Sequence, residues 1–141
     1  MYAASRFSIA IHILSLLGAT RGTQLTSEWM AGSIGVHPVI VRNITGMLRR
    51  SGLVHTQQGA AGARLARPLE QISLLDVYRA VNSQKELFCI HPHPNRYCPI
   101  GSQVTGTLKK HFGAAQRALE AHLAKTTMLQ IVRDLGAASA R

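Results

Sequence analysis

The sequence contains few acidic residues and few cysteines. Its 141 residues include 6 aspartate or glutamate side chains and 2 cysteines. So few carboxylates argue against paired acids for acid–base catalysis, and no glycine-rich phosphate cradle is present. Two cysteines do not make the disulfide framework of a small secreted domain. We therefore expect a protein that is not an enzyme, with a Cys/His nucleophile and base as the remaining enzymatic alternative.

Long apolar runs are also missing. The apolar stretch over residues 7–17 is interrupted by Ser8, His12 and Ser15, and no cleavage site follows it. This pattern does not fit a signal peptide. No segment approaches the roughly 20 apolar residues of a membrane helix. We expect a cytoplasmic protein without a membrane partner.

Basic residues, in contrast, are abundant. The chain holds 16 lysine and arginine residues, and its net charge is +10. Such an excess favours a polyanionic partner, and nucleic acid before a membrane surface, because no lone basic amphipathic helix stands out. The length predicts a single domain with a modest core.

Residues 26–50 have the pattern of a helix-turn-helix. Thr26 is placed to cap the first helix, Gly35 to supply the positive φ of a tight turn, and Pro38 to open the second helix. The apolar residues of the second helix recur at helical spacing and predict one buried face; they are Val36, Ile40, Val41, Ile44 and Leu48.

The opposite face of the second helix carries side chains that can contact bases or phosphates. The DNA-contact candidates on this helix are His37, Pro38, Val39, Arg42, Asn43, Arg49 and Arg50. An ordinary helical hairpin is the alternative, because Ala31 and Gly35 alone are a weak signature.

Two short alternating segments follow, over residues 53–57 and 63–66, with the small-residue turn QGAAG between them. A β-hairpin directly after a recognition helix is a wing, whose tip contacts the DNA backbone or the minor groove. Gln57, Gln58 and Arg64 are its candidate contacts. The alternative is a hairpin that only covers the core.

Four other segments complete the predicted architecture. Apolar spacing predicts a helix over residues 2–19, and Ser73 with Asp76 forms a capping-box pattern before a short helix. Thr127 with Gln130 predicts a last helix, over residues 128–135, that folds back. A long helix over residues 102–125 carries an apolar stripe, which suggests a dimer helix, with packing onto its own domain as the alternative; the stripe is Val104, Leu108, Phe112, Ala115, Leu119 and Leu123.

Three stretches together resemble one family. They are HPVIVRNITGMLRRSGLV, GAAGARLARPLEQISLLDVYRAV and LFCIHPHPNRYCPIG, and they are similar to the recognition helix, the wing with its following helix, and the cysteine-bearing loop of the Rrf-type transcription factors. The resemblance implies a mainly α fold with a small β-hairpin wing and a long C-terminal dimerisation helix. It also implies a homodimeric repressor that binds a pseudo-palindromic operator in double-stranded DNA.

The resemblance also implies a division of the chain and roles for its residues. Residues 1–84 would form the winged helix-turn-helix domain, residues 85–101 a sensor loop, and residues 102–141 the dimerisation helix and a short last helix. His37, Val39, Arg42 and Asn43 look like base-facing positions, and Arg49, Arg50, Gln58 and Arg64 look like backbone contacts. Ala61 departs from the family, whose wing often has two adjacent glycines.

The loop over residues 85–101 contains both cysteines, Cys89 and Cys98. Cluster-binding members of the family use three closely spaced cysteines here, so we expect no conventional iron–sulfur site, and the residues demand no cofactor. Three chemistries stay open. In the first, the cysteines are redox-active thiols, with Lys85, Arg96 and the loop histidines lowering a thiol pKa. In the second, Cys89, His91, His93 and Cys98 bind a metal such as zinc. In the third, both cysteines are inert.

Overall fold

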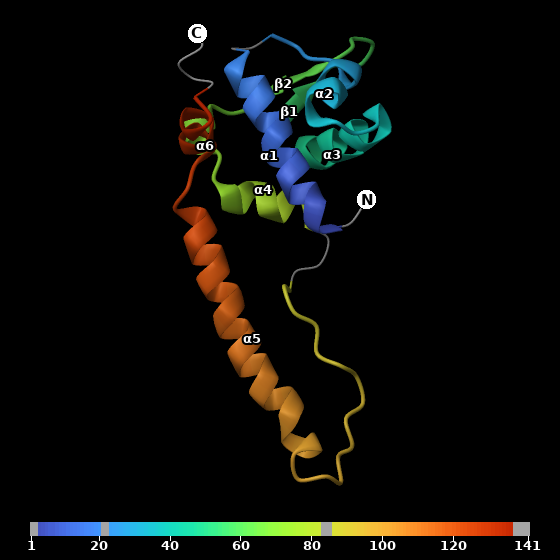
Figure 1. Cartoon of the computed structure of the whole chain (residues 1–141), viewed down its shortest axis with the longest axis vertical. Coiled ribbons are helices and arrows are strands. Elements are labelled where there is room, and N and C mark those ends of the chain that lie inside the picture. The colour runs from blue at the N-terminus through green and yellow to red at the C-terminus, as the bar shows by residue number, and fades with distance from the viewer. Residues whose placement is uncertain (1–2, 21–22, 83–85, 137–141) are drawn as a thin grey trace.

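The computed structural model describes residues 3–20, 23–82 and 86–136 of the chain. It is mainly helical with one two-stranded antiparallel hairpin, which confirms the predicted fold class (Figure 1). The elements are α1 (Ala3–Ala19), α2 (Ser27–Ile34), α3 (Pro38–Arg50), β1 (Val54–Thr56), β2 (Ala63–Leu65), the 3-10 helix η1 (Leu69–Gln71), α4 (Leu74–Val81), α5 (Gly101–Ala124) and α6 (Met128–Asp134).

Helix α1 lies at the centre of the core. Its side chains Ile13, Leu14 and Leu17 are fully buried, and the helix contacts α3, α4 and α6. Gly18 sits in its last turn, where an added Cβ would come within 2.6 Å of the Leu69 side chain, so the missing side chain lets η1 approach. Tyr2, the predicted first residue of this helix, lies outside the described residues.

The hairpin pairs Val54 with Leu65 and Thr56 with Ala63. Both strands are shorter than predicted. Leu53 is not part of β1 because its N–H donates to the Leu48 carbonyl at 3.0 Å and closes the end of α3. Leu25 forms an isolated antiparallel bridge with Ala63, which ties the segment before α2 to the hairpin.

The segment over residues 86–100 runs away from the helical body, and α5 leads back along it to α6 (Figure 1). Helix α6 then packs back onto α1 and buries Met128 and Val132, as expected from its capping pattern. Both helices end one residue before the predicted limits, at Ala124 and Asp134, within the usual uncertainty of helix ends. Within the described residues, no helix is long and apolar enough to cross a membrane.

Candidate nucleic-acid interface

Helices α2 and α3 are fixed by local caps. The Thr26 hydroxyl accepts the Trp29 N–H at 3.1 Å, and Gly35 ends α2 with φ 82°. His37 caps α3, because its Nδ1 atom accepts the Val39 N–H at 3.1 Å, and Pro38 follows in the first turn. The predicted roles of Thr26, Gly35 and Pro38 as a cap, a turn residue and a first-turn residue are confirmed. The capping role of His37 was not predicted, although a polar residue before a first-turn proline indicates an N-cap.

Helix α3 buries one face and exposes the other. Val41, Ile44 and Leu48 are fully buried against the core. The predicted DNA-contact candidates lie on the outer face, where Pro38 is half-buried and the rest are exposed; those exposed are His37, Val39, Arg42, Asn43, Arg49 and Arg50. The structure therefore brings these residues together on one surface.

One contact on this surface crosses from α2 to α3. The Arg42 guanidinium donates to the Glu28 carboxylate at 3.1 Å, with the two side chains 52% and 67% exposed. This pair was not predicted from the sequence. The pair joins residues fourteen positions apart, so the helical spacing of either element gives no sign of it.

A hollow of about 300 Å³ separates α3 from the wing. Arg42 and Arg49 line it together with Ser27, Thr45 and Gly62. Thr45 is only 7% exposed, and its hydroxyl oxygen has no hydrogen-bond partner among the described residues. The two guanidinium groups that line the hollow suit an anionic oxygen, such as that of a phosphate.

The wing tip has a defined backbone geometry. The positive-φ residues of the turn are Gly59 at 80° and Gly62 at 101°. A Cβ on Gly62 would lie 3.1 Å from the Leu25 carbonyl oxygen, so this position needs glycine. Of the wing candidates, Gln57, Gln58 and Arg64 are all exposed.

Cys98 lies at the start of α5 in a tight turn. Its N–H donates to the Asn95 carbonyl at 3.2 Å, and its own carbonyl accepts the Ser102 N–H at 2.9 Å. The backbone N–H groups of Gly101 and Ile100 donate to the Cys98 sulfur and hold the pKa of this exposed thiol below its usual value.

The thiol pKa was predicted to be lowered by basic side chains, but the causes that act on Cys98 do not include Arg96. The causes are backbone donors, Gly101 first and then Ile100. The Arg96 guanidinium instead lies over the Tyr97 ring, 5.3 Å from its centroid. Lys85 lies outside the described residues.

The other loop candidates are dispersed. Cys89 and Cys98 are both free and exposed, so neither is a buried packing residue, and His91 and His93 are exposed too. Among the described residues, no three histidine, cysteine, aspartate or glutamate side chains gather in a way that could hold a metal ion. The structure thus does not bring Cys89, His91, His93 and Cys98 together as a ligand set.

The apolar stripe of α5 is only partly covered. Leu123, next to the helical body, is its one buried member. Val104, Leu108, Phe112 and Leu119 are half-buried, and Ala115 is exposed. The chain's own body therefore does not bury most of this stripe.

Comparison with known proteins decides the class of this DNA-binding architecture. Residues 3–134 match the Rrf2 family, which is described as an iron-dependent transcriptional regulator. The chain belongs to the Rrf2 family. Among its relatives is YwnA of Bacillus subtilis (strain 168), assigned as an HTH-type transcriptional regulator, which is 39% identical over 131 residues, or 93% of this chain and 97% of YwnA.

Solved structures of other proteins share the fold of this chain. A crystal structure described as that of a DNA-binding protein is 35% identical, with a TM-score of 0.74 over 90% of this chain and 98% of that one. CymR (YrzC), the global cysteine regulator of B. subtilis, shares the fold at 15% identity, with a TM-score of 0.67 over 92% of this chain and 94% of its own. This Rrf2 protein is therefore a transcriptional regulator by family, and it shares its fold with a relative described as a DNA-binding protein.

The description of the family implies iron. In this chain the loop offers two cysteines, and no three metal-binding side chains of the described residues gather into a site. These residues do not fit a preformed iron or iron–sulfur centre.

Proposed function

We propose that this Rrf2 protein is a homodimeric repressor that binds a pseudo-palindromic operator in double-stranded DNA. The observation that carries the proposal is the outer face of α3, where Arg42, Asn43, Arg49 and Arg50 are exposed beside the wing. A helix that buries one face and presents arginine and asparagine on the other is built to enter a major groove. Such a protein works where the DNA is, in the cytoplasm.

The residues divide between base reading and backbone contact. His37, Val39, Arg42 and Asn43 face the bases. Pro38, in the first turn of the recognition helix, is a further contact with the DNA. Arg49 and Arg50 at the end of α3, with Gln58 and Arg64 in the wing, contact phosphates; the hollow between α3 and the wing supports this role for Arg49. Gln57, also in the wing, is exposed and is a further candidate contact.

The stripe of α5, which the chain's own body covers only in part, supports dimerisation. In a two-fold dimer the stripes of two α5 helices bury each other, which sets the distance between the two recognition helices. Residues 1–84 then form the DNA-binding unit, residues 85–101 the sensor loop, and residues 102–141 the dimerisation unit. Helix α6 of the last unit packs back onto the first, where Met128 and Val132 are buried.

Thiol oxidation is the signal that the loop suits best. The Cys98 thiolate, stabilised by backbone N–H groups, attacks one oxygen of hydrogen peroxide, so that its sulfur becomes a sulfenic acid and hydroxide leaves. The Cys89 thiol then attacks that sulfur, a disulfide forms, and water leaves. A disulfide in one chain or across the dimer would reshape the loop at the far end of α5.

DNA binding under two redox conditions tests the proposal. Labelled genomic fragments, including the promoter of the protein's own gene, are titrated with the full chain in reductant and again after peroxide or diamide. We expect sequence-specific binding that changes on oxidation and no longer changes in the Cys89→Ser and Cys98→Ser variants. Specific binding that ignores oxidation removes thiol control, and the absence of specific binding in both states removes the repressor.

A further inference from the structure

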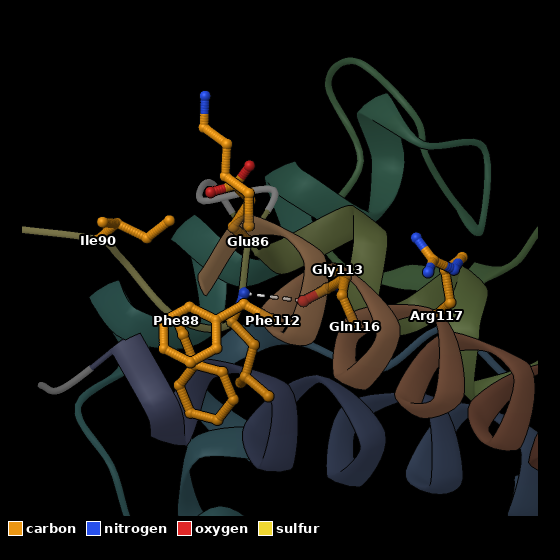
Figure 2. Close-up of a pocket in the computed structure, with 9 residues that line it drawn as sticks. Glu86, Phe88, Ile90, Phe112, Gly113, Gln116 and Arg117 are labelled. Atoms are coloured by element: carbon orange, nitrogen blue, oxygen red, sulfur yellow. Dashed lines mark hydrogen bonds between the residues drawn. The ribbon is translucent and has the colours of Figure 1, made fainter. Parts of the chain in front are cut away.

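A cavity of about 220 Å³ lies between the loop and α5, outside the DNA-binding surface (Figure 2). Leu87, Phe88 and Ile90 line it from the loop side, and Phe112 lines it from α5. Its size is below the roughly 300–1,000 Å³ of sites for drug-sized ligands, so it suits a single ring with a short side chain.

The loop is held over this cavity by defined contacts. The Leu87 N–H donates to the Gln116 Oε1 atom at 2.8 Å, and the Phe88 and Phe112 rings lie 5.1 Å apart at 49° (Figure 2). Leu87 and Phe88 nevertheless stay 47% exposed. Such apolar area beside a preformed cavity favours a ligand with an aromatic or branched apolar body.

The charged residues that line the cavity carry a net positive charge. Lys109 and Arg117 lie two helical turns apart on α5 with Gly113 between them, and they face one acidic residue, Glu86. A Cβ on Gly113 would lie 3.3 Å from an Arg117 guanidinium nitrogen, so that group lies over the glycine. Neither Lys109 nor Arg117 forms an ion pair with a described carboxylate.

We propose that this cavity is a binding site for a small aromatic carboxylate. The ring of the ligand contacts Phe88 and Phe112, and its carboxylate lies between Lys109 and Arg117. Charge complementarity selects an acid over an amine or an alcohol of the same shape, because the ligand carboxylate pairs with both Lys109 and Arg117. Glu86 would repel the carboxylate only if the ligand bound with that group toward the loop.

A chain of hydrogen bonds connects the cavity with the DNA-binding unit. Gln116, which holds Leu87, donates to the Glu120 carboxylate at 3.5 Å, and Glu120 accepts from Arg79 of α4 at 3.0 Å. A ligand that shifts the loop therefore acts on the contact between α5 and α4. This coupling rests on the proposed function, whereas ligand binding does not.

Calorimetry on the full chain tests the site without DNA. The probe is phenylacetate, and 2-phenylethanol and phenethylamine are its neutral and cationic matches. We expect saturable binding of phenylacetate alone. Lys109→Gln and Arg117→Gln should each weaken it about two- to fivefold, Lys110→Gln on the same helix should leave it unchanged, and Glu86→Gln should strengthen it.

A Gly113→Leu variant fills the cavity and should abolish binding, with circular dichroism to confirm the fold. Equal binding of the three probes, unchanged binding in Gly113→Leu, or no binding to the folded wild type would each overturn the site. Titration of a specific DNA fragment with and without phenylacetate then tests the coupling. If phenylacetate binds and the DNA affinity does not change, the coupling is overturned but the binding site stands. If the protein does not bind DNA at all, the proposed function fails, and the calorimetric result for the site is unaffected.

Discussion

The Arg42 guanidinium donates to the Glu28 carboxylate across 3.1 Å, joining the two helices of the helix-turn-helix on their outer surface. Both side chains are more than half exposed, so the pair is worth no more than about 1 kcal/mol. A base edge can therefore replace Glu28 as the partner of Arg42. In the absence of DNA, Glu28 sets the direction of the Arg42 guanidinium.

Arg42→Ala should weaken specific DNA binding by about 1–3 kcal/mol if the guanidinium makes a bidentate base contact. Fluorescence anisotropy with a set of single-base operator variants measures both the affinity and the preference. The loss of affinity on Arg42→Ala should be confined to the operators that keep the base that Arg42 contacts. An unchanged preference among the operator variants would remove Arg42 from the base-reading set.

Glu28→Gln is the matched companion of that variant. It removes the competing partner of Arg42 and a negative charge near the DNA, so binding should tighten for specific and non-specific DNA alike. The same anisotropy titrations report it. Weaker specific binding by Glu28→Gln would instead mean that Glu28 holds Arg42 in its reading position.

Arg49→Ala should weaken specific and non-specific binding together. A phosphate contact releases condensed counterions, so its loss should reduce the slope of log affinity against log salt by roughly one. Lys110→Ala is the control, because it removes the same charge from α5, away from the recognition helix. A loss confined to a single sequence would contradict a backbone role for Arg49.

The sequence predicted those features of the fold that depend on neighbours within one helical turn. Thr26 caps α2 through Trp29, and Ser73 and Asp76 form a complete capping box, as expected. These groups satisfy backbone donors only a few residues away, so the pattern and the structure carry the same information. The buried face of α3 followed from its helical spacing in the same way.

Contacts between distant segments were not predictable. The Glu28–Arg42 pair and the hydrogen bond from Leu87 to Gln116 join residues whose spacing matches no local period. The lowered pKa of Cys98 depends on backbone donors that exist only once the turn before α5 has formed. For this reason the candidate DNA surface could be assembled from the sequence, and the cavity beside the loop could not.

Gly62→Ala should destabilise the wing by about 1–3 kcal/mol. At φ 101° a side chain is strained, and the new Cβ would press on the Leu25 carbonyl. Gly32→Ala is the control: Gly32 lies in α2, its Cβ position has no described atom within 4 Å, and the change should stabilise by about 0.5–1 kcal/mol. Urea unfolding measures both; equal effects of the same sign would contradict the requirement for glycine at the wing.

Cys98 should be alkylated at a lower pH than an ordinary thiol. The Gly101 and Ile100 N–H groups stabilise its thiolate, so the pKa falls and the reactive form is present at a lower pH. Iodoacetamide modification across a pH series, followed by peptide mass spectrometry, gives the midpoint for Cys98 in folded and in urea-unfolded protein. The folded midpoint should be the lower of the two, and coinciding midpoints would contradict the backbone donation.

Leu108→Glu should convert a dimer into a monomer of about 15.3 kDa. In a two-fold dimer the change removes two apolar side chains from the shared face, each worth about 1.5–3 kcal/mol when buried, and adds two carboxylates there. Gln103→Glu on the exposed side of α5 introduces the same residue and should leave the dimer intact. Sedimentation velocity gives the masses. The Leu108→Glu variant should also bind a full-length operator much more weakly than the wild type does, whereas its affinity for a single half-site should change far less. The reason is that the two recognition helices are no longer linked. If Leu108→Glu and Gln103→Glu sediment alike as dimers, the stripe on α5 is not the dimer surface.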